Sequence, residues 1–328
     1  MNYLEKLRQR TKEVNNIICV GLDPDIDKIP STGCEEFMNK QAEPGKAIAK
    51  FYIDILNAFI SANTIPAIVK PNIAFYEQYG FKGLLALKDI IDECKRLEIP
   101  VLLDAKRGDI GKTSKAYAKA LFEFWKADAI TIAPYMGSDS VGPFLDYCGD
   151  KIDVKTSEAD NPDKKGKGVY VLVRTSNKGA VDLQNLLVCS NDNTASDSTN
   201  NTNGKPVYMK TAEKLLEWHK PGVGAVIGAT YLTELEQISS YFIEYGKQSG
   251  IGDNSSRQIP MLIPGVGAQG GSAKEVVEAL KKTRNELAIH RINSSSGINY
   301  AYLKKGTDDY CGAAVDALKE LIEQAKID

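Results

Sequence analysis

The sequence places two carboxylates and a lysine at the point where an apolar stretch ends. Residues 101–103 (Val-Leu-Leu) follow a proline and predict the start of a buried strand. Asp104 and Lys106 come next, and because they are two residues apart on an extended chain, their side chains face the same side. Asp109 follows in a glycine-flanked turn. This pattern is typical of a preorganised electrostatic site in which a carboxylate crowds a bound anion, although a solvated loop that holds a salt bridge has the same residues.

Polar residues also end other predicted strands. Asp23 ends the first strand, Lys70 and Asn72 end the second, and Ser176 follows the fifth within a Thr-Ser-Asn run. In a parallel barrel the carboxyl ends of the strands converge on one mouth, where active sites lie. A surface salt bridge needs only two such groups, so this larger set favours a functional site.

The apolar runs alternate with helical patterns along the whole chain, which predicts the α/β class and a closed, parallel (β/α)8 TIM barrel. We expect one domain over residues 1–328, with a flexible polar insertion at about 190–204. A doubly wound open sheet is the alternative, but no G-x-G-x-x-G follows the first strand. The predicted strands are 17–23, 67–72, one beginning at 101, 129–134, 168–175, 223–228, 261–264 and 288–293. The predicted helices are 3–12, 48–59, 84–94, 117–124, 139–147, 207–218, 232–246, 272–284 and 311–325.

Composition restricts the kinds of partner and the chemistry. The 41 basic and 43 acidic residues give a net charge of −2, so we expect neither nucleic acid nor an anionic membrane as a partner. The six cysteines are scattered and only two histidines occur, which predicts no metal site and no disulfide framework. The charged N-terminus has no signal-peptide core, and no 18-residue apolar run exists. We therefore expect a cytoplasmic protein.

A glycine-rich loop after the seventh predicted strand is a candidate phosphate site. It runs from Pro264 and Gly265 through Gln269 to Ser272, and it precedes a helix that Ser272 and Glu275 can cap. Four glycines allow backbone amides to approach an anion, and this loop is a recurrent phosphate site in barrels.

Five motifs lie in order along the chain. They are Gly21-Leu-Asp-Pro-Asp25, Lys70-Pro-Asn72 with Ala74-Phe-Tyr-Glu77, Asp104-Ala-Lys-Arg-Gly-Asp-Ile-Gly111, Val171-Leu-Val-Arg-Thr-Ser-Asn177 and Pro264-Gly-Val-Gly-Ala-Gln-Gly-Gly271. Together they resemble the orotidine 5′-phosphate decarboxylase family, in its longer, bacterial-type branch. The resemblance covers nearly the whole chain. It implies decarboxylation of orotidine 5′-monophosphate to UMP, the last step of pyrimidine nucleotide synthesis, without a cofactor.

The resemblance also implies roles for individual residues. Lys106 would protonate C6 after carbon dioxide leaves, and Asp104 would lie against the substrate carboxylate. Lys70 and Asp23 would hold the ribose hydroxyls and orient Lys106. The remaining expected substrate contacts include Ser176 at the pyrimidine ring and Gln269 with its loop at the phosphate. Asn72, Pro264, Gly265 and Ser296 are further expected substrate-binding residues. The resemblance also implies a homodimer, in which Asp109, Ile110 and Thr113 would reach into the partner's site.

One position departs from the family pattern. The family usually has an arginine after the eighth strand, as in S-R-G-I, where this chain has Ser296. A serine offers one neutral hydrogen bond in place of a bidentate, charged clamp, so we expect weaker nucleotide binding than in relatives. Two other functions remain possible: a magnesium-dependent sugar-phosphate decarboxylase or aldolase barrel, which would carry a glutamate where Lys70 stands, and a non-catalytic nucleotide-phosphate binder.

Overall fold

The computed structural model describes residues 1–149, 165–189, 204–248, 258–267 and 270–327. Eight parallel strands form one sheet in the order β2-β1-β10-β9-β8-β5-β4-β3. Its two ends, β2 and β3, meet through the parallel bridges Val69–Val101 and Asn72–Asp104, which bring the sheet close to a closed barrel. The expected (β/α)8 architecture is therefore confirmed. The strands are β1 Ile18–Leu22, β2 Ile68–Pro71, β3 Leu102–Arg107, β4 Ala129–Ile132, β5 Gly168–Arg174, β8 Val223–Ile227, β9 Met261–Pro264 and β10 Arg291–Ser294.

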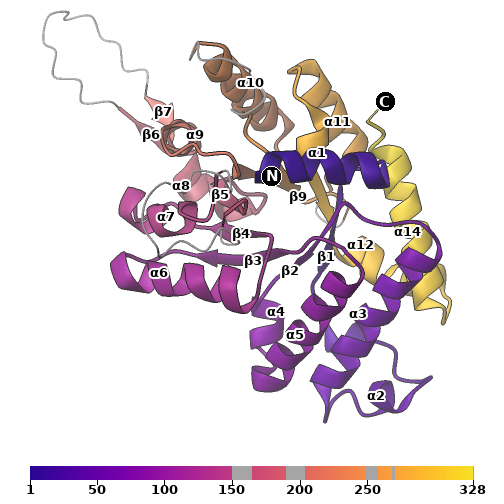
Figure 1. Cartoon of the computed structure of the whole chain (residues 1–328). Coiled ribbons are helices and arrows are strands. Elements are labelled where there is room, and N and C mark those ends of the chain that lie inside the picture. The colour runs from indigo at the N-terminus through magenta and orange to yellow at the C-terminus, as the bar shows by residue number, and fades with distance from the viewer. Residues whose placement is uncertain (150–164, 190–203, 249–257, 268–269, 328) are drawn as a thin grey trace, which may run out of the picture.

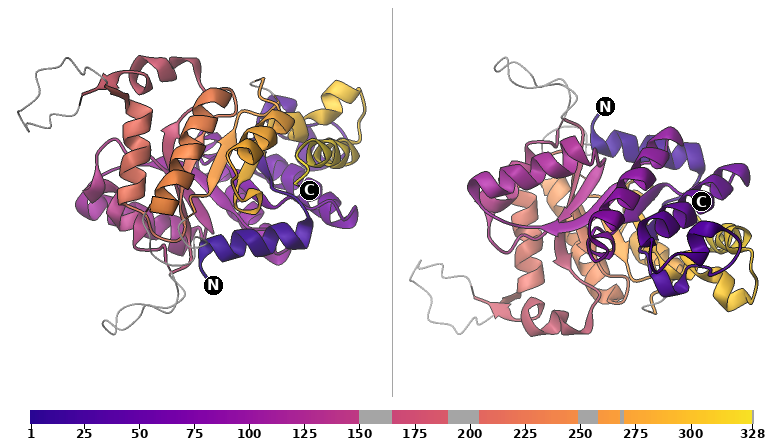
Figure 2. Two further views of the ribbon diagram at one scale, coloured as in Figure 1. Left: turned by 90° about the horizontal axis from the view of Figure 1, so that it is seen from above. Right: turned by 90° about the horizontal axis from the view of Figure 1, so that it is seen from below.

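Helices surround the strands, as Figures 1 and 2 show. Each barrel strand is followed by one long helix, in the order α3 Pro44–Ser61, α5 Gly80–Arg96, α6 Gly111–Lys119, α7 Ser138–Leu145, α9 Val207–Glu217, α10 Leu232–Gln248, α11 Ala273–Lys282 and α14 Tyr310–Gln324. The connecting loops contain short elements: α2 Glu35–Met38, α4 Ala74–Glu77, α8 Val181–Gln184, α12 Ser296–Asn299, α13 Ala301–Lys305 and the antiparallel pair β6 Leu187–Val188 with β7 Lys205–Pro206. No helix in the described ranges is long and apolar enough to cross a membrane.

The strands are apolar throughout because both of their faces are buried. One set of side chains packs outward against the helices, and a smaller set fills the barrel interior. Helix α1 (Tyr3–Val14) closes the amino-terminal end, where Tyr3, Leu4 and Leu7 join the interior set. This packing leaves the carboxyl end of the barrel for a site.

Two details differ from the sequence-based expectation. The eighth strand begins at Arg291, because Leu287–Ile289 form a 3-10 turn within the same apolar run. The helix expected over 117–124 is the end of α6 followed by a π-helical turn, Ala120–Phe124, and in it Tyr117 and Phe124 are exposed while Ala118 and Leu121 are buried. The polar insertion expected at about 190–204 lies outside the described residues except for its last position.

Candidate active site

A cavity of about 600 Å³ opens at the carboxyl ends of the barrel strands. Its floor is apolar, formed by Leu172, Val226 and Leu262. Its walls carry polar and charged residues from the loops after nearly every strand. Of the predicted site residues, the lining includes Asp23, Lys70, Asn72, Asp104, Lys106, Ser176, Pro264, Gly265 and Ser296.

Asp104 is the centre of the charged part of this cavity. The Lys70 ammonium lies 3.1 Å from its Oδ2 atom, and the Lys106 ammonium lies 2.6 Å from its Oδ1 atom. Lys70 and Asp104 are almost fully buried, whereas the side chain of Lys106 is 47% exposed and reaches into the cavity from its wall. The alternating lysine, aspartate and lysine predicted from the sequence is therefore a continuous array rather than a single salt bridge.

The charges of this array stabilise one another. Burial alone would raise the pKa of Asp104, but the Lys70 and Lys106 charges, with hydrogen bonds from Lys106 and Thr131, hold it well below its usual range. Burial alone would lower the pKa of Lys70, but the nearby carboxylates of Asp104 and Asp23 raise it above its usual value. Asp104 therefore stays anionic and Lys70 stays cationic at neutral pH.

Thr131 is a site residue that the sequence analysis missed. Its hydroxyl donates to Asp104 Oδ1 at 2.7 Å and accepts the backbone N–H groups of Ala105 and Lys106. These two amides can donate to a side chain because the backbone pairing of β3 with β4 shifts register after Leu103. Lys106 adopts a left-handed conformation there (φ 45°). A polar side chain within the apolar strand β4 was the available signal.

Asp23 lies on the wall formed by the loop after β1. Its Oδ1 atom is buried and has no hydrogen-bond partner among the described residues. A buried carboxylate oxygen without a donor is suited to accept a ligand hydroxyl. Asn72 is half-buried on the neighbouring wall, where its Oδ1 atom accepts the N–H of Ala74.

The wall next to that of Asp23 is formed by the loops after β10 and β9, because β10 pairs with β1. Pro264, Gly265 and Ser296 line it. Gly265 has a φ of 103°, in the left-handed region that favours glycine, so the backbone turns sharply there. Of the Ser272–Glu275 capping box expected at the start of α11, the structure shows the Ser272 half, with Ser272 Oγ accepting the N–H of Glu275. Gln269 lies outside the described residues.

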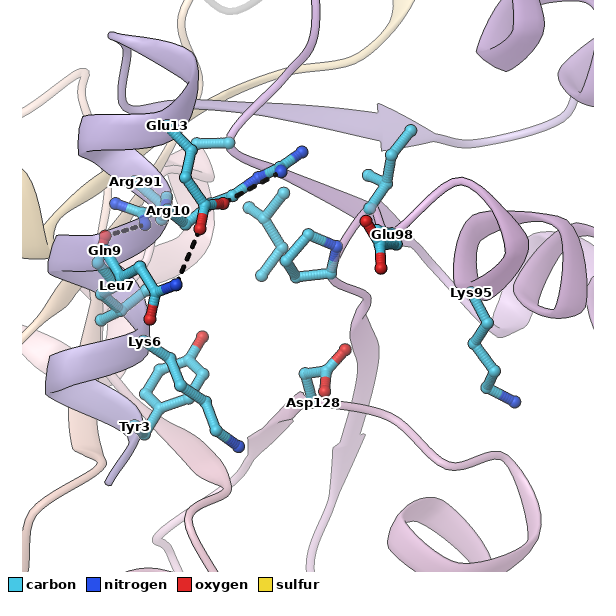
Figure 3. Close-up of a pocket in the computed structure, with 14 residues that line it drawn as sticks. Tyr3, Lys6, Leu7, Gln9, Arg10, Glu13, Lys95, Glu98, Asp128 and Arg291 are labelled. Atoms are coloured by element: carbon cyan, nitrogen blue, oxygen red, sulfur yellow. Dashed lines mark hydrogen bonds and ion pairs between the residues drawn. The ribbon is translucent and has the colours of Figure 1, made fainter. Parts of the chain in front are cut away.

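Arg291 lies at the other end of the barrel. It is fully buried, and its guanidinium donates to the carbonyls of Leu7, Ala288 and His290. Figure 3 shows it beside helix α1, on the wall of a second cavity of about 330 Å³ at the amino-terminal side. Arg291 therefore cannot take the place of an arginine at position 296.

Asp109, Ile110 and Thr113 lie outside the lining of this cavity. Asp109 is half-buried and accepts the N–H of Ile110, while Ile110 and Thr113 are exposed. Within the described ranges, no group of three or more His, Cys, Asp or Glu side chains could hold a metal ion.

The fold and the site define a (β/α)8-barrel protein with a lysine–aspartate–lysine array at its carboxyl-terminal mouth. The model of the orotidine 5′-phosphate decarboxylase / HUMPS family matches residues 17–306, so the chain belongs to this family. The chain is 36% identical to the orotidine 5′-phosphate decarboxylase of Halorubrum lacusprofundi, covering 98% of this chain and 97% of that protein. It is also 36% identical to the protein of that name from Herpetosiphon aurantiacus, covering 91% and 90%. The solved structure of Leishmania donovani OMP decarboxylase is similar, with a TM-score of 0.66, 28% identity and 99% of both chains covered.

Proposed function

We infer that this chain is a carboxy-lyase that converts orotidine 5′-monophosphate to UMP and carbon dioxide in pyrimidine biosynthesis. Its full-length similarity to relatives of that name supports this function. The structural observation that carries it is the Lys70–Asp104–Lys106 array at one side of a cavity large enough for a nucleotide.

The array suggests how the reaction proceeds. Asp104 stays anionic, so a substrate carboxylate placed against it is repelled, and this repulsion is relieved as carbon dioxide forms. The bond from C6 to the carboxylate breaks, and its electron pair remains on C6. The Lys106 ammonium, 2.6 Å from Asp104, then transfers a proton to C6 and regains one from solvent. These steps balance without a cofactor.

The other cavity residues fit the rest of the nucleotide. Asp23, with its unpartnered Oδ1, and the charged Lys70 hold the ribose hydroxyls on the side of the array. Asn72 contributes from the neighbouring wall. Ser176 contacts the pyrimidine ring. The loop of Pro264 and Gly265 holds the phosphate, together with Gln269 and Ser296.

We further propose a homodimer in which Asp109, Ile110 and Thr113 complete the partner's site. Large apolar side chains are exposed on three consecutive loops beside the mouth, and an apolar patch of this kind is typical of a protein–protein interface. Their exposed fractions are 39% for Phe75, 50% for Ile110, 93% for Tyr135 and 48% for Met136. A partner that covered this face would place the loop of Asp109 near the opposite cavity.

The alternative is a magnesium-dependent sugar-phosphate barrel of the same family. The 3.1 Å ion pair of Lys70 with Asp104 argues against it, because an ammonium in this position repels a divalent cation. The discriminating assay follows the absorbance of orotidine monophosphate with and without a chelator. Turnover that resists the chelator supports our inference. Chelator-sensitive sugar-phosphate chemistry, or binding without turnover, would contradict it.

We place the enzyme in the cytoplasm. All six cysteines carry free thiols, and Cys19, Cys94 and Cys148 are buried as packing residues. This usage fits a reducing compartment.

A further inference from the structure

The phosphate group of the substrate needs a positive charge, and few cations face the cavity. Among the described residues that line it, the only Lys or Arg side chains are Lys28, Lys70 and Lys106. Lys70 and Lys106 are both bound to Asp104, at the reacting end of the site. Ser296 contributes only a neutral hydroxyl. Lys28 is therefore the cation of this lining that remains outside the array.

Lys28 lies on the loop that follows β1, in a 3-10 turn of Ile26–Lys28. Its side chain is 51% exposed, and its Nζ atom lies 2.7 Å from the Asp25 carboxylate. The same atom lies 5.5 Å from the centre of the Tyr300 ring. Lys28 thus sits on an aromatic surface at the rim with only a surface ion pair, which contributes little to stability.

The loop that carries Lys28 is packed against the loop that carries Ser296. A side chain at Gly21, near the end of β1, would collide with the Ser295 side chain, so glycine allows the close approach of β1 to the loop of Ser296. Asn299 donates to the Gly21 carbonyl at 2.9 Å. Tyr300 donates its hydroxyl to the Asp23 carbonyl as well. The rim around Lys28 and the loop of Ser296 are therefore one continuous wall.

The backbone at Lys28 is held firmly, whereas its half-exposed side chain has only the surface ion pair with Asp25 and the contact with the Tyr300 ring. The Tyr302 hydroxyl donates to the Lys28 carbonyl at 2.5 Å, and the buried Lys40 ammonium donates to the next carbonyl, that of Ile29, at 2.5 Å. Only the side-chain rotamers of Lys28 must be ordered when an anion binds, which limits the entropy lost on binding.

We propose that Lys28 supplies the positive charge that binds the phosphate of the nucleotide, from the wall where Ser296 offers none. This inference rests on the proposed function, because that function makes a phosphate monoester the ligand. Without a nucleotide, the Asp25 carboxylate binds the Lys28 ammonium at the rim. When the nucleotide binds, its more highly charged phosphate binds the same ammonium. Lys28 is a binding residue for the phosphate and takes no part in proton transfer.

The test compares ligands with and without a phosphate. UMP and uridine are each titrated into the wild-type chain and Lys28→Ala, with Lys46→Ala as a control on an exposed lysine outside the cavity lining. We expect Lys28→Ala to weaken UMP binding about tenfold or more and to leave uridine binding unchanged. The double variant Lys28→Ala/Ser296→Arg should regain UMP affinity. Thermal melting checks that each variant is folded.

Each outcome decides the proposal. Equal effects on UMP and uridine, or no effect on either, would overturn the role of Lys28. A phosphate-specific loss at Lys28 together with no decarboxylation by the wild-type chain would support the phosphate site while contradicting the proposed reaction. Decarboxylation by the wild-type chain with an unchanged KM in Lys28→Ala would leave the reaction standing and overturn the role of Lys28.

Discussion

Replacing Asp104 by asparagine should destabilise the fold, because it leaves the Lys70 ammonium buried without its partner. The two side chains are only 9% and 5% exposed. Removing one member of such a buried pair destabilises a protein by about 3–5 kcal/mol. The Asp23 carboxylate remains near Lys70 and offsets part of the loss. We therefore expect Asp104→Asn to lower the free energy of unfolding by about 3 kcal/mol.

A double variant tests whether the loss in Asp104→Asn comes from the unpaired buried charge of Lys70. Lys70→Met combined with Asp104→Asn removes the buried charge, and it should return to within about 1 kcal/mol of the wild type. Asp25→Asn is the matched control, because the Asp25–Lys28 pair has 38% and 51% exposed side chains and contributes less than about 1 kcal/mol. Urea unfolding at pH 7, followed by tryptophan fluorescence, measures all three. A loss below about 1 kcal/mol in Asp104→Asn, or no recovery in the double variant, would refute this reasoning.

Three further predictions follow from single features of the structure. Burial lowers the pKa of His290 to about 3, so the unfolded chain, with a histidine pKa of 6.5, binds the proton first as pH falls. Between pH 8 and pH 5, the free energy of unfolding should therefore fall by about 2 kcal/mol more in the wild type than in His290→Asn, and equal slopes in the two proteins would contradict this expectation. Ser296→Arg should lower the KM for the nucleotide, and an unchanged KM would contradict the expected phosphate contact. Mixing inactive Lys106→Ala with inactive Asp109→Ala should restore about a quarter of wild-type activity, because in the proposed homodimer one site of each mixed dimer would keep both residues; no recovery would exclude a shared site.

The barrel could be predicted because its strands are buried on both faces and so form apolar runs. The same rule failed at the eighth strand, where the apolar run includes a 3-10 turn before Arg291. Helical spacing of apolar residues failed at Phe124, which is apolar but 61% exposed. Hydrophobic spacing predicts which residues can be buried, and the packing of neighbouring elements decides which ones are.

The site was predicted where it depends on position along one strand. Asp104 and Lys106 share a side, and the ends of β1 and β2 bring Asp23 and Lys70 to the same mouth. Thr131 could not be assigned, because its role depends on a register shift between β3 and β4 that the sequence does not encode locally. The contacts across a subunit interface remain predictions for the same reason: they depend on another chain.

We propose that Lys106 protonates the carbon from which carbon dioxide leaves. The most direct measurement is the release of carbon dioxide from orotidine monophosphate by Lys106→Ala, in the presence of a chelator, alongside UMP binding by the same variant. We predict that carbon dioxide release is abolished while UMP still binds, because the cavity and Asp104 remain. Turnover by Lys106→Ala at the wild-type rate would contradict the proposed mechanism.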